Sequence, residues 1–372
     1  MWSAVTGSDP APLTLPAAIR GVVVLVVDGL GRELLDGHGS IAPMLAAAPG
    51  PTLDATFPAA TATNLTSLAT GRAPVAHGIT GSFLTLPGQA QRLSTLTWTF
   101  HRMDGADARS ALPPEDLQPV PTVFERADDA GVRVTRVLRA EFLDSGLTRA
   151  ALRGGTPRAA QDLDTTLTVA IDAAVRRPDA VAGSRDPAIV YAHHGEVDQI
   201  GHVLGPGSDE WCTALAAVEG ALRRARDQLP ADVAIVVTAD HGMVTVADDG
   251  FVDLVDRPDL LAGVRAVGGD PRAKQLMVID GAHDDVVATW RAHVGDRGLV
   301  LTRAEAIAAG WFGSPVDLRP AVAERIGEVI VAAADPIAWI ESDRDPFGGR
   351  LPGQHGAPTD TELAIPAVTL VR

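Results

Sequence analysis

The chain has 372 residues, of which 46% are hydrophobic and 21% are charged, so it can bury a large core. Its formal net charge of −16 excludes a general affinity for nucleic acid or for an anionic membrane. Cys212 is the single cysteine, which excludes an internal disulfide and a cysteine-based zinc site. Lys274 is the one lysine among 31 basic residues, so a catalytic lysine is nearly excluded.

The sequence contains no sign of export or membrane insertion. Its N-terminal stretch lacks a basic segment followed by an apolar one. The longest purely aliphatic run, Val22–Val27, is too short to cross a bilayer. We therefore expect a cytoplasmic protein with a small-molecule substrate and no membrane or nucleic-acid partner, and the oligomeric state stays open.

The apolar pattern predicts strands and helices in alternation. The continuous aliphatic run Gly21–Val27 is typical of a strand buried on both faces of a parallel sheet, and GLGRELLDG then begins a helix. A second helix is predicted over Thr61–Thr70, ended by Gly71. Further strands are predicted at Val132–Leu138, Ala188–Tyr191, Val233–Thr238 and Ala367–Val371, and helices at 160–176 and 209–228. This alternation indicates an α/β fold with a mainly parallel central sheet and helices on both faces.

A later stretch, 251–345, has the pattern of an insertion. Strands are predicted at Gln275–Ile279 and Val329–Ala332, and helices at Asp284–His293 and Arg303–Ala309. We predict a core over 1–250, a small α+β cap subdomain over 251–345, and the C-terminal part of the core over 346–372.

Asp28 directly follows the first strand, and this excludes a dinucleotide-binding interpretation of the GLGRE segment. In a dinucleotide-binding fold the phosphate lies where this carboxylate stands, and the two anions would repel each other. The third glycine of that motif is also replaced, by Leu34.

Carboxylates and imidazoles are placed where strands end or one helical turn apart. Asp28 and the adjacent Asp240 and His241 follow apolar strands. Asp198 and His202 are four residues apart, so one helical turn can aim both at one point, although a surface ion pair has the same spacing. His355, in PGQHGAP, is equally compatible with a surface position. This mixture of Asp and His favours zinc or a similar metal over magnesium.

Thr61 is a candidate nucleophile at a helix N-terminus, where free backbone amides and the helix dipole stabilise an anion. A threonine hydroxyl needs a metal to lower its pKa before it attacks. A simple N-capping role for Thr61 stays open. His193 and His194 precede Asp198 closely enough to line the same site. Arg72 could reach a substrate anion from the helix end, although a solvated arginine is favoured.

Together these motifs resemble the alkaline phosphatase superfamily, most closely its nucleotide pyrophosphatase/phosphodiesterase branch. The segments that carry the resemblance occur in family order: VVVLVVDGLG, FPAATATNLTSLATGRAPVAHGI, EVDQIGHVLGP, VVTADHGM and QHG. The resemblance implies an alkaline-phosphatase-like core and two divalent metal ions, by analogy zinc. One ion would be held by Asp28, Thr61, Asp240 and His241, and the other by Asp198, His202 and His355. It also implies that Asn64 helps to hold a phosphoryl oxygen while Thr61 forms a covalent phospho-threonine.

Two departures bear on the substrate. Ala62 stands where nucleotide-cleaving relatives usually have a phenylalanine, and Tyr191 is the only tyrosine, so a nucleotide preference is not expected. The C/S-x-P-x-R motif of sulfatases is absent. The expected activity is hydrolysis of a phosphodiester or pyrophosphate. The alternatives are a phosphonate hydrolase such as phosphonoacetate hydrolase, a phosphomonoesterase or a phosphomutase on the same core, or a metal-independent binding module. The last is disfavoured because none of the seven ligands is missing.

Overall fold

The structure is a computed structural model that describes residues 13, 15–89, 91–101, 105–175, 187–344 and 349–372. The predicted end of one helix, residue 176, lies outside the described residues. Within the described part of the chain, no helix combines the length and the apolar character needed to cross a membrane.

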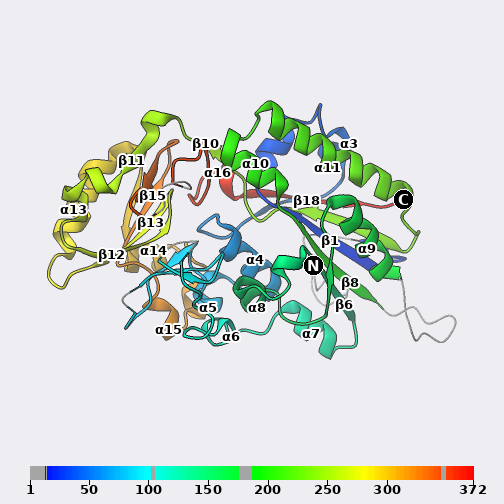
Figure 1. Cartoon of the computed structure of the whole chain (residues 1–372), viewed down its shortest axis with the longest axis horizontal. Coiled ribbons are helices and arrows are strands. Elements are labelled where there is room, and N and C mark those ends of the chain that lie inside the picture. The colour runs from blue at the N-terminus through cyan, green and yellow to red at the C-terminus, as the bar shows by residue number, and fades with distance from the viewer. Residues whose placement is uncertain (1–12, 14, 90, 102–104, 176–186, 345–348) are drawn as a thin grey trace.

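A seven-stranded sheet with the order β2-β18-β9-β1-β8-β6-β7 forms the centre of the molecule (Figure 1). Its strands are β1 (Gly21–Val27), β2 (Thr52–Asp54), β6 (Arg133–Leu138), β7 (Thr156–Ala159), β8 (Ala188–His194), β9 (Val233–Thr238) and β18 (Ala364–Leu370). β1 lies between β8 and β9 and is parallel to both, whereas β18 is antiparallel to β9 and to β2. The prediction of a mainly parallel central sheet is therefore confirmed.

Helices cover both faces of this sheet, as predicted. Side chains of β1 alternate, so that Val23 and Leu25 join one hydrophobic cluster and Val26 joins another. The first cluster contains residues of α2 (Arg32–Gly37), α3 (Pro43–Ala47), α9 (Leu163–Val175) and α11 (Asp209–Asp227). The second contains residues of α4 (Thr61–Thr70), α7 (Val123–Asp129) and α8 (Gly146–Ala151).

A second sheet, antiparallel with the order β12-β13-β15-β14, lies at the other end of the molecule (Figure 1). It consists of β12 (Val264–Asp270), β13 (Ala273–Val278), β14 (Gly298–Thr302) and β15 (Val329–Ala333), with α12 (Pro258–Leu261), α13 (His283–Val294), α14 (Arg303–Ala308) and α15 (Pro320–Ala323). These elements match the α+β pattern predicted for the insertion, and the exact boundaries at 250 and 345 stay a prediction.

Short elements connect the two regions. The small sheets are β3 (Phe83–Leu84), β4 (Leu93–Ser94) and β5 (Thr99–Phe100); β10 (Val244–Thr245) with β17 (Gly353–Gln354); and β11 (Phe251–Asp253) with β16 (Ala338–Ile340). The remaining α-helices are α5 (Pro74–His77), α6 (Pro114–Leu117), α10 (Glu196–Leu204) and α16 (Asp360–Leu363). Single 3₁₀ turns are formed by Ala140–Phe142, Asp248–Gly250, Leu254–Asp256, Gly295–Arg297 and Pro315–Asp317.

A buried ion pair joins the second sheet to the C-terminal segment of the core. The Arg272 Nε and Nη2 atoms donate to the two carboxylate oxygens of Glu362, each at 2.9 Å, and these side chains are 1% and 0% exposed. Glu362 also accepts a hydrogen bond from the backbone amide of Ala357, at 2.9 Å. This carboxylate therefore fixes the chain two residues beyond His355.

Removing Glu362 should leave the buried Arg272 charge without its carboxylate partner, although its Nη1 atom still donates to the carbonyls of Asp335 and Ile337. We expect Glu362→Ala to lower the free energy of unfolding by about 3–5 kcal/mol, as is typical when one member of a buried pair is lost. The exposed Arg257–Asp259 pair supplies the control. Asp259→Ala should leave the free energy of unfolding nearly unchanged, because an exposed ion pair contributes little. Equal losses in the two variants, measured by chemical denaturation, would contradict this assignment.

Candidate metal centre and active site

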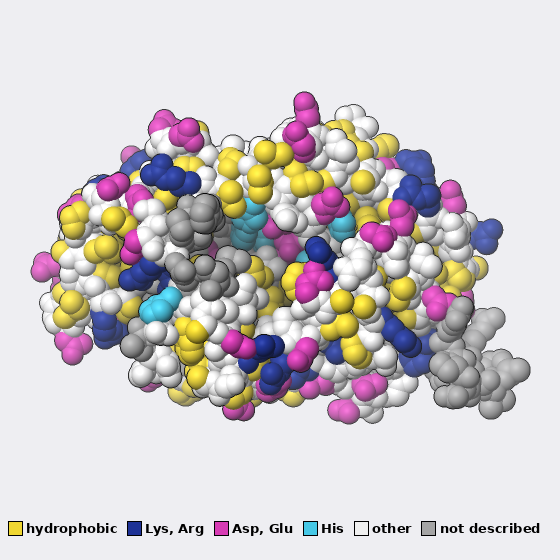
Figure 2. All heavy atoms as spheres, in the orientation of Figure 1, with side chains coloured by type: hydrophobic (Ala, Val, Ile, Leu, Met, Phe, Trp, Pro, Cys, Tyr) yellow, Lys and Arg dark blue, Asp and Glu magenta, His cyan; other side chains and the backbone are white. Residues whose placement is uncertain are grey.

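The seven predicted site residues come together at the carboxyl end of the central sheet. Because the carboxyl ends of parallel strands meet at one edge, residues that are distant in sequence converge there. Asp28 follows β1, Asp240 and His241 follow β9, Thr61 begins α4, Asp198 and His202 lie on α10, and His355 follows β17. Figure 2 shows histidine and acidic side chains inside a hollow at the centre of this face of the molecule.

Thr61 lies beside the first group of ligands. Its Oγ1 atom is 3.1 Å from Nε2 of His241. That nitrogen is in turn 3.6 Å from one carboxylate oxygen each of Asp28 and Asp240. Ala60, not Thr61, is the N-cap of α4, and no side chain caps this helix. The simple capping role is therefore wrong, and the hydroxyl is directed to the metal-ligand group.

Asp198, His202 and His355 form the second group. Nε2 of His202 is 3.2 Å from Nε2 of His355 and 3.5 Å from a carboxylate oxygen of Asp198. Two sets of donor atoms, each within a span of 4.8 Å, could hold a metal ion: Asp198 with His202 and His355, and Asp28 with Asp198 and His241. Asp198 thus belongs to both sets, although the family resemblance assigned it to one.

Backbone carbonyls set the orientation of all three imidazoles. Nδ1 of His202 bonds to the carbonyl of Gly353 at 2.8 Å, and Nδ1 of His355 to that of Ala59 at 2.7 Å. Nδ1 of His241 lies 2.9 Å from the carbonyl of Gly242. Each Nδ1 must therefore carry the proton, which leaves Nε2 as a lone pair, the form that binds a metal. The Nε2 lone pairs of His202 and His355, 3.2 Å apart, repel each other unless a cation lies near them.

The carboxylates also fit a cation. One oxygen of each, Oδ1 of Asp28, Oδ1 of Asp198 and Oδ2 of Asp240, is buried and has no hydrogen-bond partner among the described residues. Burial raises the pKa of Asp28 well above its usual value, and the nearby Asp240 and Asp198 raise it further. Burial, followed by His241 and His202, lowers the pKa of His355 and keeps it neutral. Buried anionic oxygens beside neutral imidazoles are the donor set of a divalent transition metal.

His193 contacts the site more closely than the sequence indicates. Its Nε2 is 3.1 Å from Oδ2 of Asp28, the oxygen that does not face His241. β8 extends three residues beyond its predicted end at Tyr191, and the pairing of β8 with β1 places His193 opposite Val26. His194 instead lies 3.7 Å from Glu196. The period-two alternation from Tyr191 to His193 is the signal that could have identified this contact.

Two glycines of the motifs are required by close approach. Gly29 has a φ of 72°, and a Cβ there would lie 2.9 Å from a carboxylate oxygen of Asp198. A Cβ on Gly242 would lie 2.0 Å from the carbonyl oxygen of Thr361. Gly29 lets the end of β1 pack against α10, which explains a glycine directly after Asp28 without a dinucleotide, and Gly242 lets the segment after β9 pack against α16.

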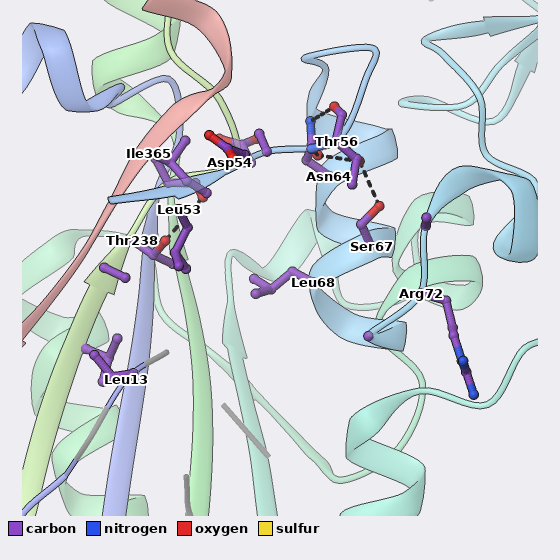
Figure 3. Close-up of a pocket in the computed structure, with 17 residues that line it drawn as sticks. Leu13, Leu53, Asp54, Thr56, Asn64, Ser67, Leu68, Arg72, Thr238 and Ile365 are labelled. Carbon is purple, nitrogen blue, oxygen red and sulfur yellow. Dashed lines mark hydrogen bonds between the residues drawn. The ribbon is translucent and has the colours of Figure 1, made fainter. Parts of the chain in front are cut away.

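Asn64 holds the loop that precedes Thr61 (Figure 3). Its Oδ1 accepts from the backbone amide of Thr56 at 2.6 Å and from the Thr56 hydroxyl at 2.7 Å. Its Nδ2 donates to the carbonyls of Thr56 and Pro58, each at 3.2 Å. Both amide hydrogens are therefore engaged, and the contact of Asn64 with a phosphoryl oxygen stays a prediction.

The hydrogen bonds continue from Thr56 into the core. Ser67 Oγ is 2.9 Å from Thr56 Oγ1 and 2.9 Å from Nε2 of His77. The amide of Ile79 donates to Nδ1 of His77, so Nε2 must be the protonated nitrogen. Burial, with Arg319 and Arg325 nearby, lowers the pKa of His77 to about 3, which keeps the ring neutral. The helix that carries Thr61 is thus anchored on the side away from the metal ligands.

Arg72 does not lie near Thr61. It follows the C-terminal end of α4, about 15 Å along the helix axis from Thr61 at 1.5 Å per residue. Figure 3 shows its side chain extending away from Asn64 and Thr56. Because the two residues stand at opposite ends of one helix, this geometry favours the solvated arginine over a contact with a substrate anion at Thr61.

The fold and this arrangement of candidate metal ligands match what the sequence motifs predict for the alkaline phosphatase superfamily. The family model for type I phosphodiesterase / nucleotide pyrophosphatase matches residues 22–358, and the chain belongs to that family. The predicted family resemblance is therefore confirmed. No curated protein sequence matches the chain.

Solved structures share the fold across most of their length. Murine ectonucleotide pyrophosphatase / phosphodiesterase 5 is similar with a TM-score of 0.69 and 17% identity, covering 95% of this chain and 88% of that one. The human protein of the same name gives 0.69 and 14%, covering 94% and 87%. Phosphonoacetate hydrolase from Sinorhizobium meliloti 1021, in complex with phosphonoformate, gives 0.65 and 19%, covering 95% and 90%. At these identities the likeness is one of fold.

The two ligand groups predict metal stoichiometry. We expect about two zinc ions per chain, measured by elemental analysis after zinc loading and dialysis. His355→Ala should retain about one, because it removes a donor from only one group. His283→Ala, with a side chain 43% exposed on α13, is the matched control and should retain both ions. A full complement of zinc in His355→Ala would contradict the assignment.

Proposed function

We propose that the protein is a zinc-dependent phosphodiesterase that works through a covalent phospho-threonine on Thr61. The observation that carries this proposal is the position of the Thr61 hydroxyl, 3.1 Å from Nε2 of His241 and at the first residue of α4. A hydroxyl that caps no helix and instead joins a group of buried carboxylates and imidazoles is placed for nucleophilic attack.

Asp28, Thr61, Asp240 and His241 would hold one metal ion, and Asp198, His202 and His355 the other. When bound, the ions supply the Lewis acidity that lowers the pKa of the Thr61 hydroxyl and offsets charge on the phosphoryl oxygens. Asp198, which belongs to both sets of donors, would keep the two sites close together. His193 would orient the Asp28 carboxylate through its contact at 3.1 Å.

The chemistry consists of two displacements at phosphorus. In the first, the Thr61 oxygen forms a bond to phosphorus as the ester bond to the leaving alcohol breaks, and the alcohol departs with the hydroxyl proton. In the second, water attacks phosphorus and the bond to Thr61 breaks, which restores the hydroxyl and releases a phosphomonoester. The first amides of α4 have no partner within the helix and would donate to the phosphoryl oxygens in both steps.

The scarcity of cations supports a diester over a monoester substrate. A monoester carries one more negative charge than a diester, so its site needs additional positive charge. Among the described residues that line the cavity beside Thr61, Arg139 is the only lysine or arginine, and Glu141 pairs with it at 2.7 Å. The Nζ atom of Lys274, on β13 of the second sheet, lies 4.0 Å from a carboxylate oxygen of Glu341.

A phosphonate hydrolase is the second candidate. The fold shared with phosphonoacetate hydrolase favours it. What weighs against it is the same lack of cations, because a phosphonate with a further carboxylate presents more negative charge than a diester does. Monoesterase and phosphomutase activities meet the same difficulty.

Replacement of the nucleophile tests the covalent mechanism. Thr61→Ala should lower kcat on an aryl phosphodiester by about 10³-fold or more, because the covalent step is lost. Thr61→Ser keeps a hydroxyl and should retain far more activity. Both variants should still bind zinc through the remaining donors. Activity of Thr61→Ala close to that of the unaltered protein would overturn the mechanism.

Substrate charge can be tested with matched esters. We expect para-nitrophenyl methyl phosphate, a diester, to have a kcat/KM about tenfold or more above that of para-nitrophenyl phosphate, as when about 1.4 kcal/mol of charge compensation is missing. Phosphonoacetate, assayed by phosphate release, should be cleaved more slowly still. A preference for the monoester or for phosphonoacetate would identify one of the alternative activities.

A further inference from the structure

An apolar pocket opens beside the nucleophile. It is a cavity of about 630 Å³ that Thr61 and Asp28 border at one end. Leucines from α4, the end of β6, α8 and the start of α9 form its walls: Leu65, Leu138, Leu147, Leu152 and Leu163. Leu96 and Phe142 also line it and are 38% and 44% exposed, which places them at its mouth. Two large apolar side chains left exposed around one opening are typical of a ligand-binding cleft.

The charges around this pocket disfavour a polyanion. Of its described lining residues, Asp162 and Glu196 are carboxylates that belong to neither set of candidate metal ligands, and Arg139 is the only lysine or arginine. Arg139 is already paired with Glu141. A nucleoside polyphosphate would bring further negative charges next to Asp162 and Glu196.

The pocket also lacks a pair of ring faces that could hold a nucleobase. Of its described lining residues, only Phe142 and Tyr191 carry phenyl or phenol rings. Tyr191 is 1% exposed, and its ring packs against Phe124 with centroids 5.6 Å apart. Ala62, the residue after the nucleophile, lies on the buried side of α4 and is not among the residues that line the pocket. Phe142 is 44% exposed, and the Arg139 guanidinium lies over its ring, 6.0 Å from the centroid, so this ring has no aromatic partner among the described lining residues with which to enclose a base.

The position of the pocket identifies which part of a substrate it holds. In an in-line displacement the leaving oxygen lies opposite the attacking oxygen. Thr61, Asp28 and Asp198 line the pocket, whereas His202 and His355, the other two donors of the second set, do not. A group that lies beside Thr61 is therefore the ester group that remains on phosphorus, not the one that leaves.

We propose that this pocket binds the retained ester group of the phosphodiester and that it selects a compact apolar group, aryl or branched alkyl, over a nucleoside. The inference rests on the proposed phosphodiesterase function and names its substrate class. The binding energy comes from the removal of the apolar group from water against leucine side chains.

Three diesters with the same leaving group test this selection. They are para-nitrophenyl methyl phosphate, para-nitrophenyl phenyl phosphate and the para-nitrophenyl ester of thymidine monophosphate. The leaving group and the reacting bond are the same in all three, so differences in kcat/KM report the retained group. We expect the phenyl ester to exceed the methyl ester by about tenfold or more, since a phenyl ring adds a large apolar area. The thymidine ester should fall below the phenyl ester.

Substitutions at the mouth of the pocket test whether its side chains cause the preference for the phenyl ester. Phe142→Ser and Leu96→Ser should each lower the ratio of kcat/KM for the phenyl over the methyl ester several-fold, because each removes apolar wall. Both side chains are partly exposed, so folding should tolerate the change. Leu299→Ser, on β14 and 51% exposed, is the matched control and should leave the ratio unchanged.

The outcomes separate the two proposals. If the zinc-loaded protein cleaves none of the three esters, the phosphodiesterase function is overturned, and this inference with it. If it cleaves them but prefers the thymidine ester, or treats phenyl and methyl alike, the function stands and the apolar selection is overturned. An unchanged phenyl-to-methyl ratio in both mouth variants would likewise overturn the role of this pocket.

Discussion

The fold brings several carboxylates together at one edge of the buried central sheet, and burying their charge costs folding free energy. Asp28, Asp198 and Asp240 each keep a buried carboxylate oxygen that no described residue satisfies. Three imidazoles present Nε2 lone pairs to the same space, because their Nδ1 protons are held by backbone carbonyls. Such an assembly opposes folding by several kcal/mol per unpaired charge unless cations occupy it. The hydrogen bonds from the imidazoles to backbone carbonyls oppose the repulsion among these donors, because they hold the metal-ligand candidates close together.

The restraint on His355 shows how both regions of the chain share the site. Its Nδ1 bonds to the carbonyl of Ala59, in the loop that leads into the Thr61 helix. Two residues later, the amide of Ala357 bonds to Glu362, which Arg272 of the second sheet holds from the other side. A shift of the second sheet would therefore move a metal ligand and the nucleophile loop together. Through these contacts the second sheet is linked to two of the candidate site residues, His355 and Thr61.

Local pattern is enough to place the candidate ligands that directly follow strands, but it does not predict contacts that cross from one strand to another. Asp28 and Asp240 follow long apolar runs, so a single strand indicates each of them. His355 has no such local signal, and only the order of the family motifs indicated it. The contact of His193 with Asp28 depends on the register between β1 and β8, which are joined across more than 160 residues of chain. The hydrogen bonds of Asn64 depend on the fold of the loop at 56–58, which propensity does not determine.

Substrate selection in this fold is tied to the hydrophobic core. Leu65, Leu138, Leu147 and Leu152 line the pocket beside Thr61, and the same four belong to the core cluster between α4, α8 and the sheet. The wall of the pocket is thus the outer surface of a packed core. Truncating such a leucine removes core packing worth about 2–5 kcal/mol, whatever it does to the substrate. Substitutions that alter substrate selectivity are consequently tolerated mainly at the mouth, where Leu96 and Phe142 are partly exposed. Substitutions deep in the pocket would also destabilise the fold.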